Sequence, residues 1–209
     1  MKFKRLCAVL LGFVIWFFVP SISTSATYLN YQVSNYTGYV QGKSNWCWAA
    51  SAVASGRHAN PSSYRTQSQV VKFTKGIFDN SEAPNVQANI YETAIAATYA
   101  SLNNAVYYGY DAKLNVEPMV QKILQDRVTI LQYGYYFAGE RISGHMVTIV
   151  RYETYTNTTT RNVYVYDPKD GVTYSYNHMD LYNGEIPFYI MINGEMYECS
   201  MEMERYCYY

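Results

Sequence analysis

Hydrophobic residues recur at helical spacing through the first half of the chain, from about residue 45 to residue 126. Apolar residues there are three and four positions apart and alternate with polar ones, which is typical of helices with one buried face. We expect helices to begin after Asn45, near Thr66 and after Asn115, because these residue types cap helices. The four predicted helical segments are residues 46–58, 63–78, 85–102 and 114–126.

The pattern changes after Arg127 to short runs rich in β-branched residues and tyrosine. Such runs, separated by Gly, Asn and Pro, are typical of strands joined by turns. Helices followed by strands predict an α+β fold with a twisted antiparallel sheet in the second half. The helical part is expected at residues 41–126, the sheet part at 127–194 and a C-terminal tail at 195–209. The expected strands are residues 128–137, 145–154, 161–167, 172–176 and 187–194.

The first 26 residues predict a secretory signal peptide. Lys2, Lys4 and Arg5 precede an apolar run at residues 6–19, and a stretch of small residues ends at Ala26. As a helix this run covers about 21 Å, less than the roughly 30 Å of a membrane core, so an uncleaved anchor is the weaker alternative. We expect cleavage after Ala26, export of the protein, no membrane attachment afterwards, and a single domain at residues 27–209.

Composition and charge argue against several classes of protein. The chain has 16 basic and 16 acidic side chains among 209 residues, and without residues 1–26 its net charge is about −3. A neutral to mildly acidic chain has no electrostatic attraction for nucleic acid or anionic lipid. Hydrophobic residues make up 49% of the chain, which argues against intrinsic disorder. Most of the tyrosines suit half-buried positions in the sheet.

Three cysteines follow the predicted signal peptide, namely Cys47, Cys199 and Cys207. In an oxidising compartment Cys199 and Cys207 could pair across a short loop, which would leave Cys47 as a lone thiol. The sequence has no Cys/His spacing of the kind that binds zinc, so we expect neither a metal nor another cofactor.

Cys47 lies in the first turn of the first predicted helix, within the segment QGKSNWCWAAS at residues 41–51. The free N–H groups and positive dipole end of a helix start favour an anion, so the Cys47 thiolate should form readily. Gln41 lies six residues upstream, where its amide could donate to a developing oxyanion. The alternative is a buried core cysteine between Trp46 and Trp48.

A thiolate nucleophile needs a base, and the chain has three histidines. His58 is eleven residues from Cys47 on the same predicted helix, about 16 Å away, and His178 lies in a polar stretch that predicts a surface turn. His145 is expected to open a strand directly after Gly144, from which it could point across a cleft. The alternative for His145 is a sheet-edge residue without a chemical role.

Asp167 is the expected partner of His145. It ends the predicted strand at 161–167, directly before Pro168. If this strand forms an antiparallel hairpin with the strand at 145–154, Asp167 lies beside His145 and can accept its Nδ1–H. The alternative is a turn cap, which is a common role for aspartate before proline.

The segment QGKSNWCWAAS resembles the active-site segment of papain-like cysteine peptidases, in which a glutamine precedes the nucleophile by six residues and Cys-Trp-Ala opens the central helix. GHMVTIV resembles the histidine strand of that family, and YVYDPKDG resembles the Asp-Pro segment of its compact bacterial members. Within the family the chain is most similar to peptidases related to those that cut double-glycine bacteriocin leaders, and to secreted bacterial effector proteases. The resemblance covers residues 41–188.

The resemblance implies a papain-like fold, with a helical first lobe, a sheet lobe and an active-site cleft between them. It implies that Cys47 is the nucleophile, His145 the general base and acid, and Asp167 the residue that orients His145. It also implies that Gln41 donates to the oxyanion beside the backbone N–H of Cys47. The chain departs from papain at Ser44, where papain has a disulfide cysteine, and in having aspartate rather than asparagine as the orienting residue.

These features predict an exported cysteine peptidase that cleaves a peptide or protein substrate through a Cys47 acyl-enzyme. Two alternatives stay open. One is a peptide-binding or adhesive module that keeps the fold without turnover, and the other is an acyl or peptidyl transferase that uses the same thiolate. None of the three involves nucleic acid, and the sequence assigns neither the substrate nor an oligomeric state.

Overall fold

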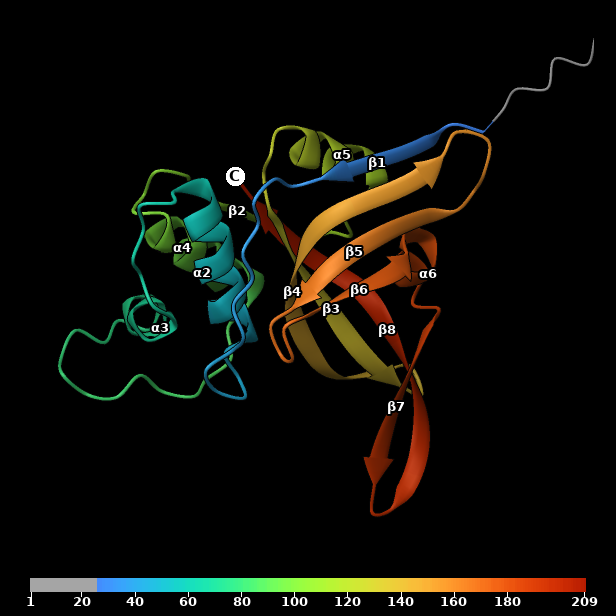
Figure 1. Ribbon diagram of the computed structural model, residues 1–209. Coiled ribbons are helices and arrows are strands. Elements are labelled where there is room, and N and C mark those ends of the chain that lie inside the picture. The colour runs from blue at the N-terminus through green and yellow to red at the C-terminus, as the bar shows by residue number, and fades with distance from the viewer. Residues whose placement is uncertain (1–25) are drawn as a thin grey trace, which may run out of the picture.

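In the computed structural model, which describes residues 26–209, four of the five helices precede most of a large antiparallel sheet (Figure 1). The fold is therefore α+β, as the order of helical and strand patterns predicts. The helices are α2 (Cys47–Ala59), α3 (Gln67–Thr74), α4 (Ile90–Ala100), α5 (Val116–Leu124) and α6 (His178–Asn183).

The sheet has eight strands within the described residues, and all of its neighbours pair antiparallel. Its main order is β2-β8-β3-β4-β5-β6, while β1 pairs with β4 and β7 pairs with β8. The strands are β1 (Tyr28–Gln32), β2 (Tyr108–Tyr110), β3 (Thr129–Phe137), β4 (Glu140–Tyr155), β5 (Arg161–Asp167), β6 (Val172–Asn177), β7 (Ile186–Ile192) and β8 (Glu195–Tyr208).

The helix starts follow from local capping in some places and from tertiary contacts in others. Thr66 and Asn89 each form a capping box with a residue three positions later, which satisfies free N–H groups at the starts of α3 and α4. Asn115 precedes α5 as predicted, although its side chain makes no capping bond. Asn45 does not cap α2, because Trp46 occupies the cap position and Asn45 binds the loop at Asn85 instead.

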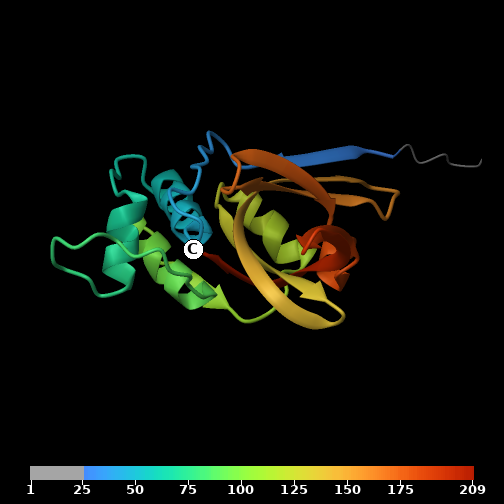
Figure 2. The same cartoon turned by 90° about the horizontal axis from the view of Figure 1, so that it is seen from below.

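Two hydrophobic cores hold the chain together. Figure 1 shows α2, α3 and α4 grouped on one side of the sheet, and Figure 2 shows the same separation from below. The first core joins these helices to the sheet, and the second lies among the sheet strands, α5 and α6. Buried members of the first include Trp48, Val53, Val70, Ile90, Ala97 and Ile130, and members of the second include Leu114, Met119, Leu131, Val147, Val163 and Leu181.

Strand β4 begins at Glu140, five residues earlier than predicted. It pairs with β3 through Gly144 opposite Gly134 and His145 opposite Tyr133. His145 therefore lies within a long strand and does not open it, which corrects the sequence-based expectation. The turn between β3 and β4 is short because Ala138 and Gly139, both with positive φ, complete the reversal on their own.

The predicted C-terminal tail is wrong, since residues 195–208 form β8, which lies between β2 and β3. Cys199, Met201, Met203 and Cys207 are buried along it, alternating with polar residues as in a strand that faces a core. The predicted disulfide is wrong for the same reason. Eight residues of strand span about 26 Å, far more than a disulfide can bridge, and both thiols are free.

The predicted signal peptide lies outside the described residues except for Ala26, and its cleavage stays a prediction. Across residues 26–209, the helices are too short or too polar to pass through a lipid bilayer.

Candidate active site

Cys47 is the first residue of α2. The N–H of Trp46 donates to the carbonyl of Lys43, whereas the N–H of Cys47 has no acceptor among the described residues. A helix leaves its first N–H groups unsatisfied and carries a partial positive charge at this end, so the position stabilises a thiolate or an oxyanion. Cys47 is partly exposed, in contrast to the buried Cys199 and Cys207. The alternative of a buried core cysteine is therefore wrong.

His145 and Asp167 form a buried pair on neighbouring strands. Nε2 of His145 lies 2.6 Å from Oδ1 of Asp167. The hairpin of β4 and β5 that predicts this contact is present, but the imidazole nitrogen that meets Asp167 is Nε2 rather than Nδ1. Nδ1 is therefore the nitrogen that can exchange a proton with the Cys47 sulfur.

Asp167 is held by the turn that follows it. Its Oδ1 also accepts the backbone N–H of Lys169 at 2.7 Å, and its carbonyl accepts the N–H of Gly171. Gly171 has a φ of 78°, which favours glycine at this point of the turn. The turn-cap role weighed for Asp167 is thus present together with the contact to His145, and the cap fixes the carboxylate that orients the imidazole.

The environment of His145 favours its charged form. Burial disfavours the imidazolium, but hydrogen bonds to Asp167 and Cys47 outweigh that effect and raise the pKa of His145 to about 9. The Cys47 thiol is therefore one of the groups that influence the charge of the imidazole. The ring of Tyr133 packs against His145, with centroids 5.5 Å apart, and restricts its rotation.

Cys47 and His145 line one cleft of about 660 Å³. The helical part contributes the start of α2 and residues 87–92 to its lining, and the sheet part contributes β3, β4, β7, β8 and the turn after β5. Its apolar surface includes Trp48, Tyr135, Ile142, Met146 and Phe188. A cleft of this size accommodates a short peptide segment in contact with both the thiol and the imidazole.

Gln41 does not line this cleft. Its Nε2 donates to the carbonyls of Lys43 and Ser44, at 3.0 and 2.8 Å, so both amide hydrogens bind the loop before α2. Its Oε1 is buried without a hydrogen-bond partner among the described residues. In this conformation Gln41 fixes the shape of the loop, and an oxyanion contact would require it to release one carbonyl.

A loop that the sequence pattern did not single out fastens the Cys47 segment in place. Oδ1 of Asn85 accepts the N–H of Asn45 at 3.0 Å, and Nδ2 of Asn85 donates to Ser44 Oγ at 2.9 Å. The indoles of Trp46 and Trp48 donate to the carbonyls of Pro84 and Val86, both at 2.9 Å. The capping box at Asn89 is the sequence signal that could have identified this loop. It places the start of α4 after residues 85–88, which the sequence pattern assigns to the helix.

The other two histidines take structural positions. Nε2 of His58 is 2.9 Å from the carbonyl of Asp126, far along α2 from Cys47. His178 is only 2% exposed and its Nε2 donates to the carbonyl of Leu114, so the predicted surface turn is wrong. Its burial follows from α6, which begins at His178 and packs against the second core.

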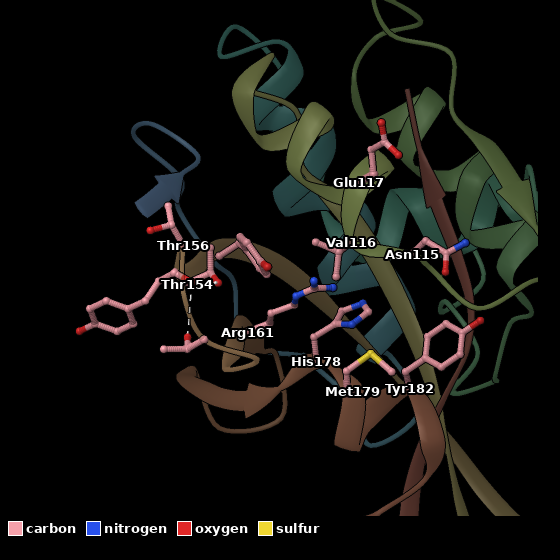
Figure 3. A pocket seen from close by; sticks show the side chains of 12 residues that line it. Asn115, Val116, Glu117, Thr154, Thr156, Arg161, His178, Met179 and Tyr182 are labelled. Atoms are coloured by element: carbon pink, nitrogen blue, oxygen red, sulfur yellow. Dashed lines mark hydrogen bonds between the residues drawn. The ribbon is translucent and has the colours of Figure 1, made fainter. Parts of the chain in front are cut away.

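Figure 3 shows a second cavity, whose lining includes His178, Arg161, Asn115 and Tyr182. Its lining includes no cysteine and no histidine–carboxylate contact, so it offers no nucleophile–base pair. Within residues 26–209 no three His, Cys, Asp or Glu side chains are grouped as metal ligands would be. Among residues 26–209, Cys47 is the cysteine that is not buried, and it lies in the first of these two cavities.

No protein-family model matches this chain, and a comparison with curated proteins finds no relative of it.

Proposed function

We propose that this protein is an exported cysteine peptidase with a papain-like arrangement, in which helices and sheet meet at the active-site cleft. The observation that carries the proposal is that His145, which contacts the buried Asp167, lines the same cleft as a cysteine at a helix start. A buried carboxylate, an imidazole and a thiol in this order are the three groups that nucleophilic acyl transfer requires.

The groups divide the reaction between them. The Cys47 thiolate attacks the carbonyl carbon of the scissile bond, and the imidazolium of His145 gives its proton to the leaving amine. The resulting thioester is hydrolysed by water, from which His145 takes a proton. Asp167 holds the imidazole orientation, and the backbone N–H of Cys47 donates to the oxyanion of each tetrahedral intermediate. Gln41 would add a second donor after releasing Lys43 or Ser44.

A transferase would use the same groups, with an amine in place of water. A binding module without turnover is less well supported, because such a protein has no need of a buried His145–Asp167 pair beside an accessible thiol.

The test is intact-mass spectrometry of the purified protein after incubation with a peptide that carries a thiol-directed electrophile, with Cys47→Ala as control. We expect one adduct on the wild type and none on the variant. A library of capped peptides, analysed with and without an added amine, then separates hydrolysis from transfer. Absence of any cleavage or transfer, together with a Cys47 that reacts no faster than free cysteine, would refute the proposal.

A further inference from the structure

The wall of the Cys47 cleft contains an arginine whose position is fixed from behind. Nε of Arg141 on β4 donates to Oε1 of Glu204 on β8, and Nη2 of Arg141 donates to Oε2 at 3.0 Å. The Glu204 side chain is 10% exposed and that of Arg141 is 41% exposed, so the carboxylate lies beneath the guanidinium. Such a two-bond contact fixes the orientation of the guanidinium plane.

Two glycines provide the space for this pair. Gly134 and Gly144 lie directly opposite each other on β3 and β4. A Cβ atom at Gly134 would collide with the Glu204 carboxylate, and one at Gly144 would collide with Nη2 of Arg141. The guanidinium therefore lies over Gly144, the residue directly before His145. Any larger side chain at Gly144 would displace it.

The carboxylate of Glu204 has no remaining capacity for a ligand. Beside the two bonds from Arg141 it accepts Tyr136 Oη at 2.8 Å and Gln132 Nε2 at 3.0 Å. Four donors fill the four lone-pair positions of a carboxylate. Arg141 is not saturated, because its Nη1 makes no hydrogen bond within the described residues. Arg141 thus offers the cleft the two N–H donors of Nη1, while Glu204 balances the charge of the guanidinium.

Two of the other three charged residues in the lining, Lys169 and Arg205, are also basic. Lys169 is exposed and makes no ion pair among the described residues, and Arg205 pairs with Asp111, which lies outside the lining. The one acidic residue in the lining is Glu92, which binds Lys75 at 2.6 Å. Counted with the ion-pair partners of its charged residues, the cleft therefore has a small excess of positive charge, from Lys169, in a chain whose described part is mildly acidic.

We propose that the cleft selects peptides with an aspartate or glutamate side chain near the scissile bond, and that Arg141 is the residue that binds this carboxylate. The inference rests on the proposed peptidase function, since it assigns the substrate class of the same cleft. Arg141, ordered in advance by Glu204, loses little freedom when it binds a carboxylate.

The test compares capped peptides that differ only by Asp or Glu against Asn or Gln, placed in turn at each position around the scissile bond. We expect one position at which the acid raises kcat/KM roughly five- to tenfold, mainly through KM, and less so at high ionic strength. In Arg141→Gln the acid-to-amide ratio should fall towards one. The control is Arg151→Gln, which breaks an Arg–Glu pair of the same strand outside the cleft lining and should leave the ratio unchanged.

A second variant keeps the proposal testable if Arg141→Gln fails to fold with Glu204 unpaired. Arg141→Glu combined with Glu204→Arg retains the ion pair with its charges exchanged, and the preference should move from acidic peptides towards lysine peptides. A ratio near one at every position in the wild type would overturn the inference while leaving the peptidase intact.

Binding separates this inference from the proposed function. In Cys47→Ala protein, an acidic peptide should shift the NMR resonances of Arg141 and its neighbours more strongly than the matched amide peptide does. That result without any turnover of the wild type would support the selectivity and refute the peptidase. Equal shifts with both peptides would refute the selectivity.

Discussion

Nε2 of His145 lies 2.6 Å from Oδ1 of Asp167 because β4 contains one extra residue where it pairs with β5. The register passes from Arg151 opposite Tyr164 to Ile149 opposite Val165. Continued from there, Asp167 shares a face of the sheet with His145, since side chains alternate between faces. Without this bulge Asp167 would point to the other face. The pair is a product of strand register as much as of residue identity.

The first prediction concerns the separate roles of these two residues in turnover. His145→Ala should lower kcat/KM by about 10²–10⁴-fold, because it removes the proton donor and acceptor. Asp167→Asn should cost less than Asp167→Ala, since an amide oxygen can still accept the N–H of His145 and of Lys169. Peptide cleavage by folded variants, checked by circular dichroism, measures the effects. Full activity in His145→Ala would exclude it as the base.

The second prediction is the position of the alkaline limb of the pH profile. His145 must carry its proton to protonate the leaving amine, and its pKa is raised to about 9, so kcat/KM should fall as the pH rises through about 9. Asp167→Asn removes a carboxylate that stabilises the imidazolium. The pKa of His145 then falls and the alkaline limb moves to lower pH. A limb that stays in place in Asp167→Asn would show that another group controls it.

The sequence predicted what depends on local pattern. The strand at 161–167 has the predicted bounds, and the pairing of its hairpin brought Asp167 to His145 as expected. Capping residues located the start of α3. These features depend on residues close in sequence, whose preferences are expressed locally.

What failed depends on contacts between distant segments. Residues 195–208 contain no Gly or Pro, and buried and polar side chains alternate along much of the segment. Their place between β2 and β3, however, depends on strands that are far away in the sequence. The packing of α6 against the second core hides His178, which its polar neighbours did not indicate. The Arg141–Glu204 pair joins residues 63 positions apart, and the glycines that admit it become neighbours only in the paired sheet.

The third prediction is that burial, and not a disulfide, protects Cys199 and Cys207 from alkylation. Iodoacetamide should label Cys47 in native protein and spare Cys199 and Cys207, which are 4% and 0% exposed. Burial also raises the pKa of Cys207 far above its ordinary value, so its thiolate is scarce. Added reductant should not change the pattern, whereas denaturant should expose all three thiols. Labelling of Cys199 and Cys207 only after reduction would instead support a disulfide between them.

The last prediction assigns the loop at Asn85 a role in positioning Cys47. Asn85→Ala removes the side-chain contacts to Asn45 and Ser44, which hold the segment directly before the nucleophile. We expect kcat/KM to fall roughly tenfold and mainly through kcat, because a loose helix start misplaces both the thiol and the oxyanion donor. Asn85→Asp should lose less, since its carboxylate can still accept the N–H of Asn45.

Asn104→Ala is the matched control for this variant, because Asn104 makes a similar side-chain contact, to the carbonyl of Ala59 at the other end of α2. Each substitution should lower the free energy of unfolding by about 1 kcal/mol or somewhat more, as expected for losing one or two hydrogen bonds. Only Asn85→Ala should also slow the alkylation of Cys47 by a peptide electrophile. Equal effects of the two variants on that rate would mean that the Asn85 loop stabilises α2 without positioning its first residue.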